Sequence, residues 1–174
     1  MGKKHLPTAE RLWLAGEIQR LIAIASDATR PESKWADNLV RNAYLWYWTA
    51  DGISAKGKVT RDLLKMDVEF LRHTEKARAA LQEGRRRDVM HEHAVPRKIL
   101  LDHLKQEGLN SPLEIKEFLD QFCIGVLIEK AAEAPKLKPW ESTMPSPFST
   151  ESNPLERYEA AELKVLDPKN PRLD

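Results

Sequence analysis

The sequence has 174 residues, a length typical of a single domain. Its 28 basic and 27 acidic side chains give a net charge of +1, so no whole-molecule field attracts a polyanion. A single cysteine excludes an internal disulfide framework and a cysteine-rich zinc module. No apolar run reaches the roughly 18 residues of a membrane span, and the first residues lack the apolar region of a secretory signal. We therefore expect a globular protein in the cytoplasm.

The charge is unevenly distributed along the chain. Residues 72–98 carry eight basic and four acidic side chains, whereas residues 99–174 carry nine basic and fourteen acidic ones. A local basic segment can dock an anionic partner even in a neutral protein, because charges act over a Debye length of about 8 Å at physiological salt. The other interpretation is a solvated helix face followed by a basic turn, and the composition leaves both open.

The first half of the chain has the pattern of helices. Apolar residues recur at helical spacing, which predicts helices over 8–25, 33–50 and about 60–83. Thr8 is the candidate N-cap of the first helix. Most of the five tryptophans lie on these apolar stripes, so we expect them in the core rather than as platforms for stacked bases.

The pattern changes in the second half. Residues 88–95 have no helical period and predict a short strand, and a helix follows Pro96. Residues 111–114 form a capping box with proline at the first helical position, which predicts a helix start. Residues 123–128 predict a buried apolar strand, and Pro135 prevents a long helix after it.

These elements predict a mainly α protein with a small two-stranded β element, which is an α+β class. Residues 1–84 form a helical N-terminal region, and residues 85–137 form a core that contains both strands. Residues 138–174 form a Pro-rich C-terminal extension with a short helix near 155–163. We expect all three regions to belong to one compact domain.

The densest group of reactive side chains is His91-Glu92-His93. On a regular strand the two histidines share one face and the glutamate points to the other, although a bulge could turn it towards them. The spacing differs from the H-E-x-x-H of helical zinc proteases. Cys123 lies in the apolar strand, and no phosphate-binding glycine loop is present, which argues against a cysteine nucleophile and against ATP hydrolysis. The alternative is a pair of partly buried histidines hydrogen-bonded to backbone carbonyls.

The run Glu92-His93-Ala94-Val95-Pro96 is followed about 30 residues later by the strand at 123–128 and then by a short helical stretch. This arrangement resembles the ββα-metal core of HNH endonucleases. The resemblance covers about residues 88–137 and implies a ββα-metal-like core there, which the helical N-terminal half predicted from the apolar spacing would support. Its first motif is the more specific part, because no histidine follows His103 and the family's usual final ligand is absent.

The resemblance implies a metal-dependent endonuclease that hydrolyses phosphodiester bonds, with His93 as the general base. A divalent cation, Mg²⁺ or Mn²⁺, would neutralise the charge that develops on the phosphate. The implied metal ligands are Glu92, His91 and, on the helix, Glu133 or Glu129.

Five basic side chains flank the motif: Arg85, Arg86, Arg87, Arg97 and Lys98. Such residues hold the phosphate backbone without reading sequence. We therefore expect a nucleic acid as partner, DNA rather than RNA, and no membrane; a homodimer or a protein partner stays open. The missing final ligand supports a second hypothesis. In it, the chain is a non-catalytic module with a degenerate HNH-like core that binds nucleic acid or protein through Arg85–Arg87.

Overall fold

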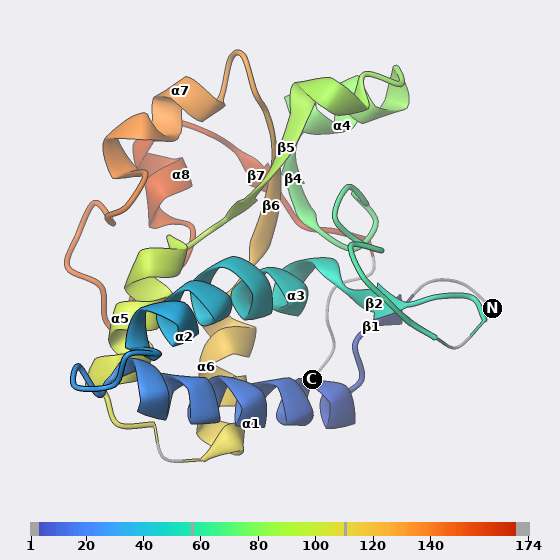
Figure 1. Ribbon diagram of the computed structural model, residues 1–174. Coiled ribbons are helices and arrows are strands. Elements are labelled where there is room, and N and C mark those ends of the chain that lie inside the picture. Colours follow the sequence, from blue (N-terminus) through green and yellow to red (C-terminus); the bar gives the residue numbers. More distant parts are fainter. Residues whose placement is uncertain (1–3, 57, 110, 170–174) are drawn as a thin grey trace.

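The computed structural model of the protein describes residues 4–56, 58–109 and 111–169. Long helices gather at one end of the molecule, and a four-stranded sheet with the short helices α4, α7 and α8 occupies the other (Figure 1). This arrangement confirms the predicted α+β class. Within the described ranges, no helix has both the length and the apolar character needed to span a bilayer.

The helical end is built around two long helical segments. Its elements are α1 (Thr8–Ala25), α2 (Ser33–Leu39), the π-helical turn η1 (Val40–Tyr44), α3 (Leu45–Ala50), α5 (Arg97–Gln106) and α6 (Pro112–Phe122). The predicted helix over 33–50 is present as α2, η1 and α3 in succession. The inward faces of these helices form one apolar core that includes Ile18, Trp48, Leu100, Leu119 and Phe122.

The caps of two helices test the sequence rules directly. Ser111 Oγ accepts a hydrogen bond from the Glu114 amide at 3.2 Å, and Glu114 Oε2 accepts one from the Ser111 amide at 3.0 Å. With Pro112 at the start of α6, the predicted capping box is confirmed. The prediction for Thr8 is wrong, because Pro7 occupies the N-cap of α1 and no side chain caps it.

The sheet has the strand order β5-β6-β4-β7. Its strands are β4 (Arg72–Thr74), β5 (Val89–His93), β6 (Gly125–Glu129) and β7 (Val165–Leu166). β5 and β7 run antiparallel to their neighbours β6 and β4, which are parallel to each other. Both predicted strands are therefore present, but the prediction of only two strands is wrong. A separate antiparallel sheet consists of β1 (Lys4–His5), β2 (Gly52–Ile53) and β3 (Val59–Thr60).

The four-stranded sheet takes strands from all three regions assigned from the sequence. β4 belongs to residues 1–84, β5 and β6 to 85–137, and β7 to 138–174. The elements around it are α4 (Glu75–Gln82), the 3-10 turns η2 (Arg86–Asp88) and η3 (Lys138–Trp140), α7 (Ala134–Leu137) and α8 (Glu156–Ala160). Pro135 lies in the first turn of the short helix α7.

Two further predictions are wrong. The helix expected over 60–83 is limited to α4, because residues 61–71 form turns and bends. The tryptophans are not all in the core: Trp48 is 1 % exposed, but Trp13 and Trp35 are 60 % and 59 % exposed. Both exposed rings lie on the outer faces of α1 and α2.

Candidate functional site

Strand β5 places the His91-Glu92-His93 motif against β6. His91 pairs with Leu127, Glu92 with Val126 and His93 with Gly125 in the antiparallel register. The strand is regular, so its side chains alternate between the two faces of the sheet. The histidines face α3, whereas Glu92 faces α7 and α8.

His93 is enclosed by protein at the start of α3. Its ring Nε2 lies 3.0 Å from the carbonyl oxygen of Leu45, and the side chain is 5 % exposed. Because a carbonyl oxygen only accepts hydrogen bonds, Nε2 carries the proton. Burial lowers the pKa of His93 to about 4, so the ring is neutral at pH 7. This ring is therefore hydrogen-bonded and shielded from the water that a general base would activate.

His91 occupies a closed space between Trp46 and β6. The centroids of the Trp46 and His91 rings are 4.6 Å apart in an edge-to-face arrangement. Both ring nitrogens of His91 are buried, and neither has a hydrogen-bond partner among the described residues. Burial and the neighbouring His93 hold the pKa of His91 well below its ordinary value.

Glu92 lies on the opposite face, in a pocket next to α7. Its Oε2 is 3.8 Å from Nη2 of Arg157, and its side chain is 31 % exposed. Burial raises the pKa of Glu92, and the charge of Arg157 acts in the other direction. The structure therefore separates Glu92 from His91 and His93 by the thickness of the sheet.

Glu133 and Glu129 lie near each other at the end of β6. The Glu133 carboxylate is buried and accepts hydrogen bonds from the Thr74 hydroxyl at 2.6 Å and from the Glu129 amide at 2.8 Å. The Glu129 carboxylate accepts a hydrogen bond from the Ala132 amide at 2.6 Å. Both carboxylates thus stabilise the turn between β6 and α7.

The described residues contain no group of three or more His, Cys, Asp or Glu side chains that could hold a metal ion. The predicted ligands explain why: His91 and Glu92 face opposite ways, and Glu133 is hydrogen-bonded to Thr74. In this arrangement the residues do not fit the Mg²⁺ or Mn²⁺ ion that the HNH resemblance implies.

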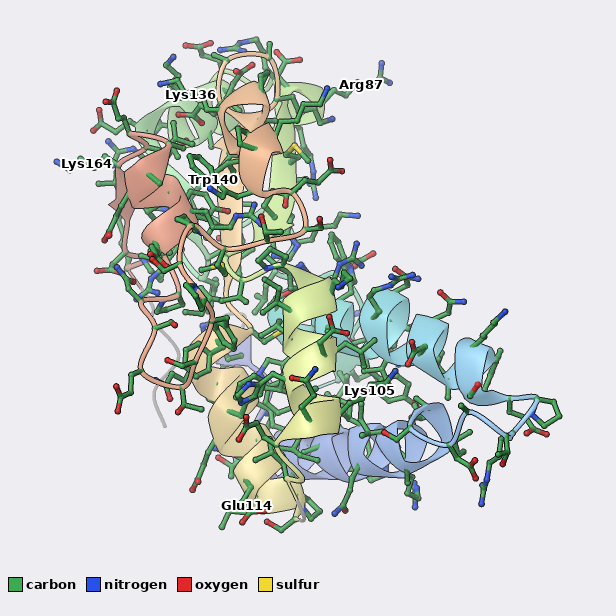
Figure 2. The ribbon with its side chains drawn as sticks, turned by 90° about the vertical axis from the view of Figure 1, so that its left-hand side faces the viewer. Arg87, Lys105, Glu114, Lys136, Trp140 and Lys164 are labelled. Atoms are coloured by element: carbon green, nitrogen blue, oxygen red, sulfur yellow. The ribbon has the colours of Figure 1, made fainter. Side chains whose placement is uncertain are left out.

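The basic residues before β5 line a groove of about 760 Å³. Its basic lining residues are Arg85, Arg86 and Arg87, together with Lys65 and Lys130 from other parts of the chain. We call the groove that these five side chains line the basic groove. Figure 2 shows Arg87 projecting outward at this end of the molecule.

The acidic side chains of the basic groove have partners within the protein. Asp88 forms an ion pair with Arg85 at 2.8 Å, and Glu83, which does not line the groove, forms another with Arg85 at the same distance. Asp62 accepts a hydrogen bond from the Trp46 indole N–H at 2.6 Å. Arg86 and Arg87, in contrast, are exposed and form no ion pair with the residues that the structure describes.

The other two predicted basic residues lie at the opposite end of β5. Lys98 forms an ion pair with Asp102 at 2.8 Å, and Arg97 donates a hydrogen bond to the Arg41 carbonyl at 3.1 Å. The structure thus does not bring Arg97 and Lys98 together with Arg85–Arg87.

No family model, curated protein or solved structure matches the chain. The HNH resemblance therefore stays a hypothesis that is based on residues 92–96 and on the succession of β5, β6 and α7.

Three residues of the site were missed from the sequence: Lys65, Lys130 and Arg157. Lys130 could have been found, since it lies two residues after a predicted strand. If the two predicted strands pair antiparallel, the end of the second lies beside the start of the first, next to Arg87. Lys65 and Arg157 carry no comparable signal, because tertiary packing alone brings them to the motif.

Proposed function

We propose that the protein binds nucleic acid through the basic groove, by contacts to the phosphate backbone. The observation that supports this proposal is the charge of the groove. Five basic side chains line it against the acidic Asp62 and Asp88. Arg85 is paired with Glu83 and Asp88, whereas Arg86 and Arg87 are exposed without an ion pair in the described part of the chain. Binding a phosphate backbone would neutralise these charges and release counterions.

In this proposal the His91-Glu92-His93 motif is structural, and the module binds without cutting. Two features support it. His93 donates a hydrogen bond from its Nε2–H group to the backbone carbonyl of Leu45, and its side chain is shielded from solvent. Glu92, the expected metal ligand, lies on the other face of the sheet beside Arg157.

The test is fluorescence anisotropy with labelled single-stranded and double-stranded oligonucleotides over a range of salt concentrations. We expect affinity to fall linearly with salt on a logarithmic plot. The double variant Arg86→Ala/Arg87→Ala should bind more weakly, and its slope for a single strand should be smaller by about 1.4, which is about 0.7 for each lost contact.

Lys98→Ala is the matched control, because Lys98 is also basic but is paired with Asp102 beyond the other end of β5. Its affinity and salt slope should equal those of the wild type. The proposal fails if the wild type binds no oligonucleotide at low salt, or if Lys98→Ala weakens binding as much as the double variant.

The metal-dependent endonuclease is the second candidate. It is favoured by the run from Glu92 to Pro96 together with the succession of β5, β6 and α7. Nicking of supercoiled plasmid with Mg²⁺, Mn²⁺ or EDTA tests it, with His93→Ala as the paired variant. Metal-dependent nicking that disappears in His93→Ala would support the nuclease, and absence of nicking by the wild type would contradict it.

A further inference from the structure

A second hollow lies on the Glu92 side of the sheet. It has a volume of about 420 Å³, within the range of small-molecule sites, and we call it the α7 pocket. One wall is apolar and contains Met90, Ile128, Ala134, Pro135 and Leu137. The polar side chains of the pocket are Glu92, Lys130, Lys138, Glu141 and Arg157.

Arg157 is the most unusual side chain of the α7 pocket. It is 2 % exposed, its Nε has no hydrogen-bond partner, and the described residues give its guanidinium no hydrogen bond at all. Its ion pair with Glu92 spans 3.8 Å, which is beyond hydrogen-bond distance. A buried guanidinium without acceptors is costly, and the oxygens of a phosphate match its fork of N–H donors. Arg157 thus indicates a ligand with an anionic oxygen group.

The α7 pocket and the basic groove share one lining residue. Lys130 lines both hollows, and it lies directly after β6, whose Ile128 lines the pocket. A strand held in the groove by its backbone would pass Lys130 to bring a nucleotide to the pocket. The carboxylate of Glu92 accepts hydrogen bonds only, so it fits the donor groups of such a nucleotide: a sugar hydroxyl or a base amino group.

We propose that the α7 pocket holds one unpaired nucleotide of the bound strand, with its phosphate on Arg157 and its base against the apolar wall. Lys130 and Lys138 add positive charge around the phosphate. The inference rests on the proposed function, since the strand in the basic groove delivers the nucleotide. It extends that function from backbone contacts to a built site for a single nucleotide.

Isothermal titration calorimetry with adenosine 5′-monophosphate, adenosine and inorganic phosphate tests the pocket alone. The nucleotide should bind, and the two partial ligands should bind at least about tenfold more weakly, because each fills only part of the site. Arg157→Lys keeps the positive charge but loses the planar guanidinium, which can donate two parallel hydrogen bonds to a phosphate. This variant should weaken nucleotide binding about tenfold. Lys138→Ala, at an exposed position on the rim, should weaken it several-fold without affecting folding.

The double variant Arg86→Ala/Arg87→Ala separates the two proposals. It should leave mononucleotide binding unchanged while it weakens oligonucleotide binding. The pocket assignment is overturned if the wild type binds oligonucleotides but not the mononucleotide, or if Lys138→Ala binds the mononucleotide like the wild type. Mononucleotide binding without oligonucleotide binding would support the pocket and overturn the basic groove.

Discussion

The ring of His91 occupies the space that a side chain at position 125 would need. A Cβ on Gly125 would lie 2.2 Å from Nε2 of His91 and 3.0 Å from its Cδ2. Trp46 packs against the same ring, so the imidazole has little room to move. We expect Gly125→Ala to lower the free energy of unfolding by about 1–3 kcal/mol through overpacking, as measured by urea denaturation.

Gly16→Ala is the matched control for this prediction. Gly16 lies inside α1, where a Cβ would lie 3.8 Å from Pro112 Cγ, an ordinary contact. Alanine has the higher helix propensity, so this variant should be up to about 1 kcal/mol more stable than the wild type. If Gly125→Ala is as stable as the wild type, the close packing of His91 on β6 is refuted.

The buried histidines make stability depend on pH. The pKa of His93 is about 4 in the folded protein and 6.5 in the unfolded chain, so between these values the unfolded chain binds more protons. The free energy of unfolding should therefore fall as the pH decreases from 6.5 towards 4, by up to about 3 kcal/mol from His93. The lowered pKa of His91 acts in the same direction.

Urea denaturation between pH 4 and pH 7 checks this dependence, with His93→Gln as the comparison. The glutamine amide can donate to the Leu45 carbonyl but does not titrate. Its stability should change less over this range than that of the wild type. Parallel curves for the two proteins would show that His93 is not protonated on unfolding.

Among the elements, those specified by local side-chain patterns are the ones that the sequence predicts. The alternation along β5 correctly puts His91 and His93 on one face of the sheet and Glu92 on the other. The capping box at Ser111 correctly marks the start of α6. In both cases residues only a few positions apart determine the structure.

The helix expected over 60–83 shows why other elements are missed. Its apolar spacing is helical, but Asp62 adopts a left-handed φ of 54° and the Asp67 carboxylate accepts a hydrogen bond from the Glu69 amide. These turn contacts compete with the helix, and apolar spacing does not detect them. The contact between Glu92 and Arg157 is equally invisible, since it joins β5 to α8 through tertiary packing.

Two cap substitutions test the element boundaries. Ser111→Ala removes the acceptor of the Glu114 amide and should lower the free energy of unfolding by about 1 kcal/mol, whereas Ser111→Asp should retain most of the stability. Thr8→Ala is the control, because the Thr8 side chain does not cap α1. It should change stability by less than about 0.5 kcal/mol in thermal or urea unfolding. Equal losses in Ser111→Ala and Thr8→Ala would contradict the assigned caps.

On the scale of the whole molecule, the sheet connects segments that are distant in sequence. β6 lies between β5 and β4, and β4 in turn pairs with β7 near the C-terminal end of the described chain. Leu127 of β6 packs in a cluster with Leu71 and Ala77, which come from the N-terminal half. α6 belongs to the middle region but packs on α1 in the apolar core. None of the three regions therefore contains a complete core.

This interdependence predicts that the chain unfolds as one cooperative unit. The isolated fragment 85–137 should show no cooperative unfolding transition, because it lacks β4 and the helices that cover α6.

In the full chain, Ile18→Ala removes apolar volume from α1 at a fully buried position and should lower the free energy of unfolding by about 2–4 kcal/mol. Hydrogen exchange should then accelerate equally for the most protected amides of α6 and of β6, although β6 lies outside the apolar core that contains Ile18. If only the α6 amides exchange faster, the helical end and the sheet are separate folding units, and the basic groove could be studied on the sheet alone.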